Sequence, residues 1–130
     1  MDIKELELAE QLKLISNANP SKCMKCGKCS GSCPSYDEME YHPHQFVSSL
    51  LNGEIEKLAK SESIWNCMSC MLCMERCPRS VAPVKIIEAV RDSVIRQQGK
   101  NYIAPEDIPG MLNEDLPQQA ITCAFRRLSK

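Results

Sequence analysis

The sequence predicts a mostly α-helical domain built around two cysteine-rich loops. A run of four cysteines and a proline occurs twice in the 130 residues. Around these runs, apolar residues recur at helical spacing, and no stretch shows the apolar–polar alternation that is typical of a strand. A chain of this length is expected to form one domain, with room for a docking tail.

The first helix is predicted over residues 2–16. It is expected to end before Pro20, because a residue that precedes proline avoids the helical conformation. Its apolar positions are Leu6, Leu8, Ala9, Leu12 and Ile15.

Prolines and glycines mark the ends of the helices that follow. Pro43 can begin a helix that Gly53 ends, and Pro83 can begin another that Gly99 ends. A short helix is expected between them, around Ile55. The inward-facing residues are expected to be Phe46, Val47, Leu50, Leu51, Leu58, Ala59, Val84, Ile87, Val90 and Val94.

The C-terminal part has a different composition. Residues 100–117 contain Pro105, Pro109 and Pro117 among polar residues, which indicates an extended segment, and residues 118–128 could form a last short helix. The chain is therefore expected to divide into an amphipathic docking helix (1–19), a central domain that carries both cysteine runs (20–99) and an extended C-terminal arm (100–130).

The repeated run is C-x2-C-x2-C-x3-C-P. Cys23, Cys26, Cys29 and Cys33 recur 44 residues later as Cys67, Cys70, Cys73 and Cys77, and Pro34 and Pro78 follow the fourth cysteines. Three thiolates at this short spacing let one loop cover three corners of an iron–sulfur cubane. In two-cluster proteins with this run, the fourth cysteine binds the other cluster.

The sequence thus predicts two [4Fe–4S] clusters with crossed ligands. The first is assigned to Cys23, Cys26, Cys29 and Cys77, and the second to Cys67, Cys70, Cys73 and Cys33. Zinc is the alternative, but a zinc ribbon uses two CxxC pairs for one ion and has no use for a third cysteine at the same spacing.

Overall composition narrows the setting of the protein. The formal charge is −1, which does not indicate a nucleic-acid partner, and no apolar run is long enough to span a membrane. The charged N-terminus lacks the apolar core of a signal peptide, so a cytoplasmic location is expected. Thiols stay reduced there, which disfavours disulfides and favours metal binding.

The two cysteine runs differ in polarity. The first is interspersed with Lys22, Lys25 and Lys28, and the second with Met68, Met71, Leu72 and Met74. One hypothesis is that the first cluster lies nearer solvent or an acidic partner and that the two potentials differ. The alternative is that these lysines are ordinary solvated loop residues.

Four other residues invite functional interpretations, but structural roles are favoured for them. His42 and His44 are expected at a helix N-terminus rather than as ligands, because eight matched cysteines already complete eight coordination positions. Trp65 is expected to pack beside a cluster and exclude water. Cys123 has no cysteine partner at ligand spacing and is expected to pack in the fold or in an interface.

Residues 20–98 resemble the C subunit of heterodisulfide reductase from methanogenic archaea. The resemblance rests on CMKCGKCSGSCP, EYHPHQFVSSLLNGEIEKL and SIWNCMSCMLCMERCPRSVAPVKIIEAVR. It implies an α-helical ferredoxin fold in an electron-transfer component of a soluble complex. Electrons would pass from the flavin-bearing A subunit to the B subunit, which reduces the mixed disulfide of coenzymes M and B in methanogenesis. The A and B subunits of heterodisulfide reductase would be partners, with hydrogenase or formate dehydrogenase components as further candidates.

The resemblance assigns no catalytic residue to this chain. Three alternatives remain. They are a free two-cluster ferredoxin, the iron–sulfur subunit of another respiratory oxidoreductase, and a structural or regulatory binding module whose clusters only hold it together. The iron–sulfur subunits of succinate dehydrogenase and fumarate reductase resemble the same helical module, but they carry a C-x4-C-x2-C domain that this sequence lacks.

Overall fold

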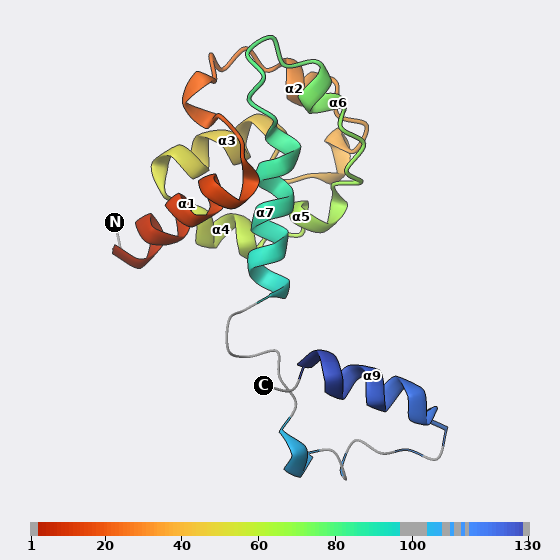
Figure 1. Ribbon diagram of the computed structural model, residues 1–130. Helices are drawn as coiled ribbons and strands as arrows, with labels where there is room; N and C mark the ends of the chain where they lie inside the picture. The colour runs from red at the N-terminus through yellow and green to blue at the C-terminus, as the bar shows by residue number, and fades with distance from the viewer. Residues whose placement is uncertain (1–2, 97–103, 108–109, 111–112, 114, 129–130) are drawn as a thin grey trace. The chain divides into compact units, whose positions relative to one another are not determined.

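The computed structural model describes residues 3–96, 104–107, 110, 113 and 115–128. The chain separates into two compact units, Met1–Ile95 and Arg96–Lys130. Both units are drawn in Figure 1, and each is described here by itself.

The elements of secondary structure in the described part of the first unit are all helices, which confirms the predicted fold class. Its longer helices are α1 (Ile3–Ser16), α3 (Pro43–Asn52), α4 (Ile55–Lys60) and α7 (Pro83–Ile95). Its short helical turns are η1 (Pro20–Lys22), α2 (Lys28–Gly31), η2 (Tyr36–Glu38), α5 (Ser63–Asn66) and α6 (Leu72–Glu75). Helices α1, α3 and α4 all contact α7, while α2 and α6 contact each other at one end of the unit (Figure 1).

The predicted ends of α3 are confirmed. The helix begins at Pro43, and Gly53 ends it with a left-handed backbone at φ 76°. At its N-terminus the backbone N–H of His42 donates to Gln45 Oε1 at 2.7 Å, forming a capping box. Helix α7 begins at Pro83 as predicted and ends at Ile95, whereas Gly99 lies outside the described residues.

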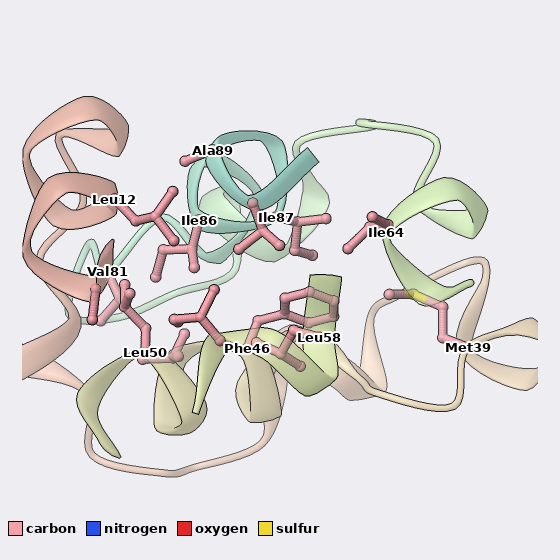
Figure 2. Close-up of a cluster of buried hydrophobic side chains, with 14 residues drawn as sticks. Leu12, Met39, Phe46, Leu50, Leu58, Ile64, Val81, Ile86, Ile87 and Ala89 are labelled. Carbon is pink, nitrogen blue, oxygen red and sulfur yellow. The ribbon is translucent and has the colours of Figure 1, made fainter. Parts of the chain in front are cut away.

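The core lies between α7 and the helices around it. Phe46 and Leu50 of α3 point toward Ile86 and Ile87 of α7, as Figure 2 shows, and all four side chains are fully buried. Burying one such side chain stabilises the fold by about 1.5–3 kcal/mol. This packing gives the unit a rigid base from which the cysteine loops extend.

The predicted apolar face of α1 is partly wrong. Ala9 and Leu12 are buried against the core, but Leu6 is 43% exposed and Ile15 is 67% exposed. The buried stripe continues to Ser16, whose hydroxyl donates to the Lys13 carbonyl at 3.2 Å. Leu6 and Ile15 lie about a quarter turn to either side of this stripe, because successive residues rotate by about 100°.

The other predicted inward-facing positions are nearly all buried. Leu51 is an exception, since it is 41% exposed beside the buried Leu50. In the second unit, the described elements are η3 (Pro105–Asp107) and α9 (Gln118–Leu128), and α9 is the predicted last helix. Among the described helices, none combines the length and apolar character that a membrane span requires.

Candidate iron–sulfur sites

The repeat seen in the sequence is also a repeat of backbone conformation. Helices α2 and α6 are offset by the same 44 residues as the cysteines. The residue that precedes each is left-handed, Gly27 at φ 74° and Met71 at φ 64°, and so are Lys25 and Ser69 at φ 54° and 52°. Each loop therefore turns twice through a conformation that is rare outside glycine.

Backbone hydrogen bonds repeat in the same register. The N–H of Ser30 donates to Gly27 O at 3.1 Å, as that of Met74 does to Met71 O at 2.9 Å. The N–H of Cys33 donates to Ser30 O and that of Cys77 to Met74 O, at 3.0 and 3.2 Å. Each short helix thus fixes the fourth cysteine of its run about one helical turn beyond the third cysteine.

The eight cysteines of the two runs line two cavities. The first cavity is lined by Cys23, Cys26, Cys29 and Cys77 among other residues. The second cavity is lined by Cys67, Cys70, Cys73 and Cys33 among other residues. Each cavity therefore receives three thiols from one run and the fourth from the other run.

The donor set fits iron–sulfur clusters. All eight side chains are free thiols rather than disulfides, and soft thiolates are the usual ligands of such clusters. Within residues 3–96 and the described part of the second unit, no three Cys, His, Asp or Glu side chains converge as they would around a single metal ion. Each set surrounds a cavity instead, as a larger multi-atom group requires.

Burial shapes the acidity of these thiols. It raises the pKa of Cys29 and Cys33 above that of an ordinary thiol, and it raises the pKa of Cys73 to about 12. A buried thiolate is costly without a positive charge beside it. A bound iron cluster would supply that charge and deprotonate the thiols, so cluster binding would also stabilise the fold.

The two cavities differ in their other lining residues. Lys25, Arg79 and His44 line the first cavity. Apart from its cysteines, the second is lined by residues without charged side chains, Pro34, Ser35, Pro43, Met68, Met71, Val84 and Ile87. The polarity difference expected from the two runs is therefore present around the cavities.

Hydrogen bonds hold the walls of the first cavity. The N–H of Val81 donates to the Sγ of Cys77 at 3.4 Å. His44 Nδ1 lies 2.7 Å from the hydroxyl oxygen of Ser30, which also accepts the backbone N–H of His44 at 3.2 Å. Burial and the charge of His42 lower the pKa of His44. The structural roles expected for His42 and His44 agree with this geometry.

Trp65 is not buried as predicted, since 52% of its side chain is exposed. The guanidinium of Arg91 lies 5.9 Å from the centre of its ring. Arg91 Nε donates to Ile64 O at 2.8 Å, and an Nη atom donates to Cys67 O at 2.7 Å. Sequence reasoning missed Arg91, which ties α7 to the second cysteine loop. Its only sequence signal is an arginine on the helix that follows that loop.

Cys123 lies on α9 and is exposed there. It is therefore not buried within its own unit, and its packing in an interface stays a prediction. The structure places all eight cysteines of the two runs, but not Cys123, in the first unit at the two cavities.

Comparison with known proteins agrees with the cysteine pattern. Residues 19–81 match the family described as 4Fe-4S dicluster domain. This match confirms the cofactor prediction of two [4Fe–4S] clusters.

Curated relatives carry the same resemblance. The chain is 37% identical over 82 residues to the iron-sulfur C subunit of the CoB–CoM heterodisulfide reductase of Methanopyrus kandleri, covering 63% of this chain and 41% of that protein. It is 39% identical over 75 residues to the C2 subunit of the H2/formate:CoB–CoM heterodisulfide,ferredoxin reductase of Methanococcus maripaludis, covering 58% of this chain and 40% of that protein.

A longer match has the same character. The C 2 iron-sulfur subunit of the CoB–CoM heterodisulfide reductase of Methanocaldococcus jannaschii is 37% identical over 102 residues, covering 75% of this chain and 54% of that protein. The resemblance to the C subunit of heterodisulfide reductase is thus confirmed, although the chain spans only about a third to just over half of the length of the relatives it matches.

Proposed function

We propose that this chain, which matches the 4Fe-4S dicluster domain over residues 19–81 and resembles the C subunit of heterodisulfide reductase, is the electron-transfer subunit of such a reductase complex. Electrons would pass through its two clusters from the flavin-bearing A subunit to the B subunit, which would reduce the mixed disulfide of coenzymes M and B. The complex would lie in the cytoplasm. The observation that carries the proposal is the sorting of eight cysteines into two crossed sets.

The proposed ligands are the cysteines that line each cavity. Cys23, Cys26, Cys29 and Cys77 would hold one cluster. Cys67, Cys70, Cys73 and Cys33 would hold the other. A bound [4Fe–4S] cluster supplies reversible one-electron chemistry.

The residues of this chain do the rest. The loops wrap the thiolates, and the buried side chains of α7 exclude water from their inner side. The Val81 N–H supports a cysteine sulfur, and hydrogen bonds of this kind raise the reduction potential.

Proximity of the two sites supports a relay. Helices α2 and α6, which end two residues before Cys33 and Cys77, contact each other. The thiol of Cys73 in the second cavity also interacts electrostatically with Cys29 of the first, and Cys33 interacts with Cys67 and Cys70. Two clusters in these cavities would therefore be near enough to exchange electrons within one polypeptide. The disulfide site would belong to a partner, since we assign no catalytic residue to this chain.

Anaerobic purification, with iron and sulfide counting and identification of every co-purifying protein, tests the proposal. We expect about eight irons and eight labile sulfides per chain, four of each per cubane. We also expect co-purification with flavin-bearing and disulfide-reducing partners. Zinc without labile sulfide would contradict the cluster assignment, whereas two reducible clusters in a chain that purifies alone would favour a free ferredoxin.

Single cysteine variants test the crossed ligand sets. Cys77→Ser should weaken the same EPR signal as Cys23→Ser, although Cys77 lies in the other run. Cys33→Ser should likewise act with Cys67→Ser. Cys123→Ser is the matched control and should retain both signals. If Cys77→Ser instead removes the signal that Cys67→Ser removes, each run binds its own cluster and the crossed assignment is wrong.

A further inference from the structure

We infer that the rim of the first cavity is a docking surface for an acidic electron-donor protein. The rim is defined by Lys25 and Arg79, which line the cavity, and Lys22 and Lys28 lie on either side of Lys25 in the sequence. The inference rests on the proposed function, because docking here is useful only if a cluster occupies the first cavity. It adds the chemistry of the partner and the face that receives it.

Charge is strongly segregated along the chain. Residues 20–36 contain three lysines and no acidic residue, and residues 76–87 contain Arg76, Arg79 and Lys85 and no acidic residue. The remaining residues carry a formal charge of −7, since the whole chain carries −1. The crossed arrangement of the cysteines brings one residue from each cationic segment, Lys25 and Arg79, to the same cavity. The overall charge hides this local concentration.

The cations of the rim are available to a partner. Lys22, Lys25, Lys28 and Arg79 are all exposed. The ion pairs found in the described part of the chain, Lys57–Glu54 and Lys60–Glu56, both involve α4 and its N-cap and none of these four residues. Their charge is therefore not neutralised by an acidic side chain among the described residues.

The second cavity serves as an internal comparison. A cubane held by four thiolates is itself negative, so the cations could act simply to offset that charge. The second cavity is also lined by four thiols, but none of its lining residues is cationic. A cationic rim is therefore not needed to offset the charge of a cluster. We attribute the difference between the two cavities to the partner that each rim contacts.

The rim also lies where an electron could enter. Cys26 is exposed, and its neighbour Met24 is 62% exposed, so a thiolate of the first site reaches the surface. One electron would leave the reduced partner and enter the oxidised cluster, and no bond would form or break. Fields of opposite sign guide such encounters and raise association rates by about 10- to 1000-fold at low salt.

Apolar side chains surround the other entrance. Trp65, Met68, Met71 and Leu72 are 37–65% exposed near the second cysteine loop. An uncharged surface of this kind gives no electrostatic guidance to a diffusing protein. The second rim is therefore the competing docking face that an experiment must separate from the first.

Stopped-flow reduction of the cluster-loaded full chain tests the inference. The probe is a reduced acidic ferredoxin, and the comparison is the same ferredoxin with its surface carboxylates changed to amides, which keeps the donor cluster. The unmodified ferredoxin should react faster, and its rate constant should fall as ionic strength rises. The double variant Lys25→Gln/Arg79→Gln should lower that rate constant about tenfold at low salt and little at high salt. Lys25→Arg, which keeps the positive charge, should retain the rate constant of the unmodified chain.

The matched control removes two charges elsewhere. Lys57→Gln/Lys60→Gln makes the same charge change on exposed residues of α4, and it should leave the rate within about twofold. EPR midpoint potentials of each variant separate a docking effect from a change in driving force. A rate that falls only in proportion to a shifted midpoint would overturn the inference.

Other outcomes are equally decisive. If the clusters reduce normally but the rate is insensitive to salt, or if Met68→Gln slows the reaction more than the double variant, the first rim is not the docking face. Binding to phosphatidylglycerol vesicles without any preference for the acidic ferredoxin would identify an anionic membrane as the partner and overturn the inference. If no probe reduces the chain at all, the proposed function itself fails.

Discussion

Two glycines of the first cysteine loop should respond in opposite directions to the same substitution. Gly27 is left-handed at φ 74°, whereas Gly31 is the last residue of α2 and has no left-handed backbone. A Cβ built on either residue meets no atom within 4 Å. Steric overlap with other atoms of the protein is therefore absent at both positions. Because Gly27 lines the first cavity, alanine would test backbone conformation alone in the cluster-free chain.

The magnitudes follow from that conformation. The left-handed region destabilises a residue with a Cβ by about 1–2 kcal/mol. Replacing glycine by alanine also lowers the entropy of the unfolded chain, which stabilises the folded state by about 0.4–1 kcal/mol. Gly27→Ala should therefore destabilise the first unit by about 1 kcal/mol. Gly31→Ala should stabilise it by about 0.5 kcal/mol, since alanine is the better helix residue. Met71 occupies the position equivalent to Gly27 at φ 64°, so the loop tolerates a side chain there.

Thermal unfolding of the cluster-free chain under reducing conditions, followed by circular dichroism at one scan rate, would measure both effects without a cluster beside Gly27. For a unit of this size, about 1 kcal/mol corresponds to a shift in Tm of about 4–8 °C. Gly27→Ala should lower Tm by about this amount, and Gly31→Ala should raise it by half as much or less. Equal shifts of the same sign would refute the conformational reasoning, because both variants add the same methyl group.

Three further outcomes are expected. Phe46→Ala should destabilise the first unit by about 3–5 kcal/mol in the same assay, whereas Leu51→Ala on the exposed side of α3 should change stability by less than about 0.5 kcal/mol; similar losses would contradict the assignment of the core. Arg91→Leu should leave the Cys67 carbonyl without this donor, so the EPR signal of the second cluster should be lost faster under mild denaturant than that of the first; equal loss would argue against the tie. The cluster-free chain should lose stability between about pH 9 and pH 12, because Cys73 stays protonated when folded and ionises when unfolded; denaturant titrations should show this slope, and Cys73→Ala should reduce it.

The sequence predicts the helices best where proline and glycine mark their ends. Pro43 and Gly53 give both ends of α3, because proline is accommodated at the first helical position and Gly53 adopts the left-handed end conformation. The end of a helix without such a signal is harder to place, and α7 stops at Ile95. The prediction for the face of α1 fails because a stripe that includes the small residues Ala9 and Ser16 packs against the core, where larger apolar residues are expected.

The cysteine sets are predictable because their spacing is a chemical constraint. Their surroundings are less so, since they depend on contacts made across the fold. Arg91 reaches the carbonyls of Ile64 and Cys67 from a helix that follows them by more than twenty residues. Trp65 lies beside the guanidinium of this same arginine, a long-range contact that no local pattern encodes.

The crossed arrangement links the charge pattern of the chain to the proposed electron path. If each run completed its own site, Arg79 would stand with the uncharged Met68 and Met71 of the second run and apart from Lys25 of the first. Exchanging the fourth cysteine instead brings Arg79 to the cavity that Lys25 lines. A single topological feature thus both joins the two halves and gives them unlike surfaces, which is why two sites made from the same cysteine run need not serve the same partner.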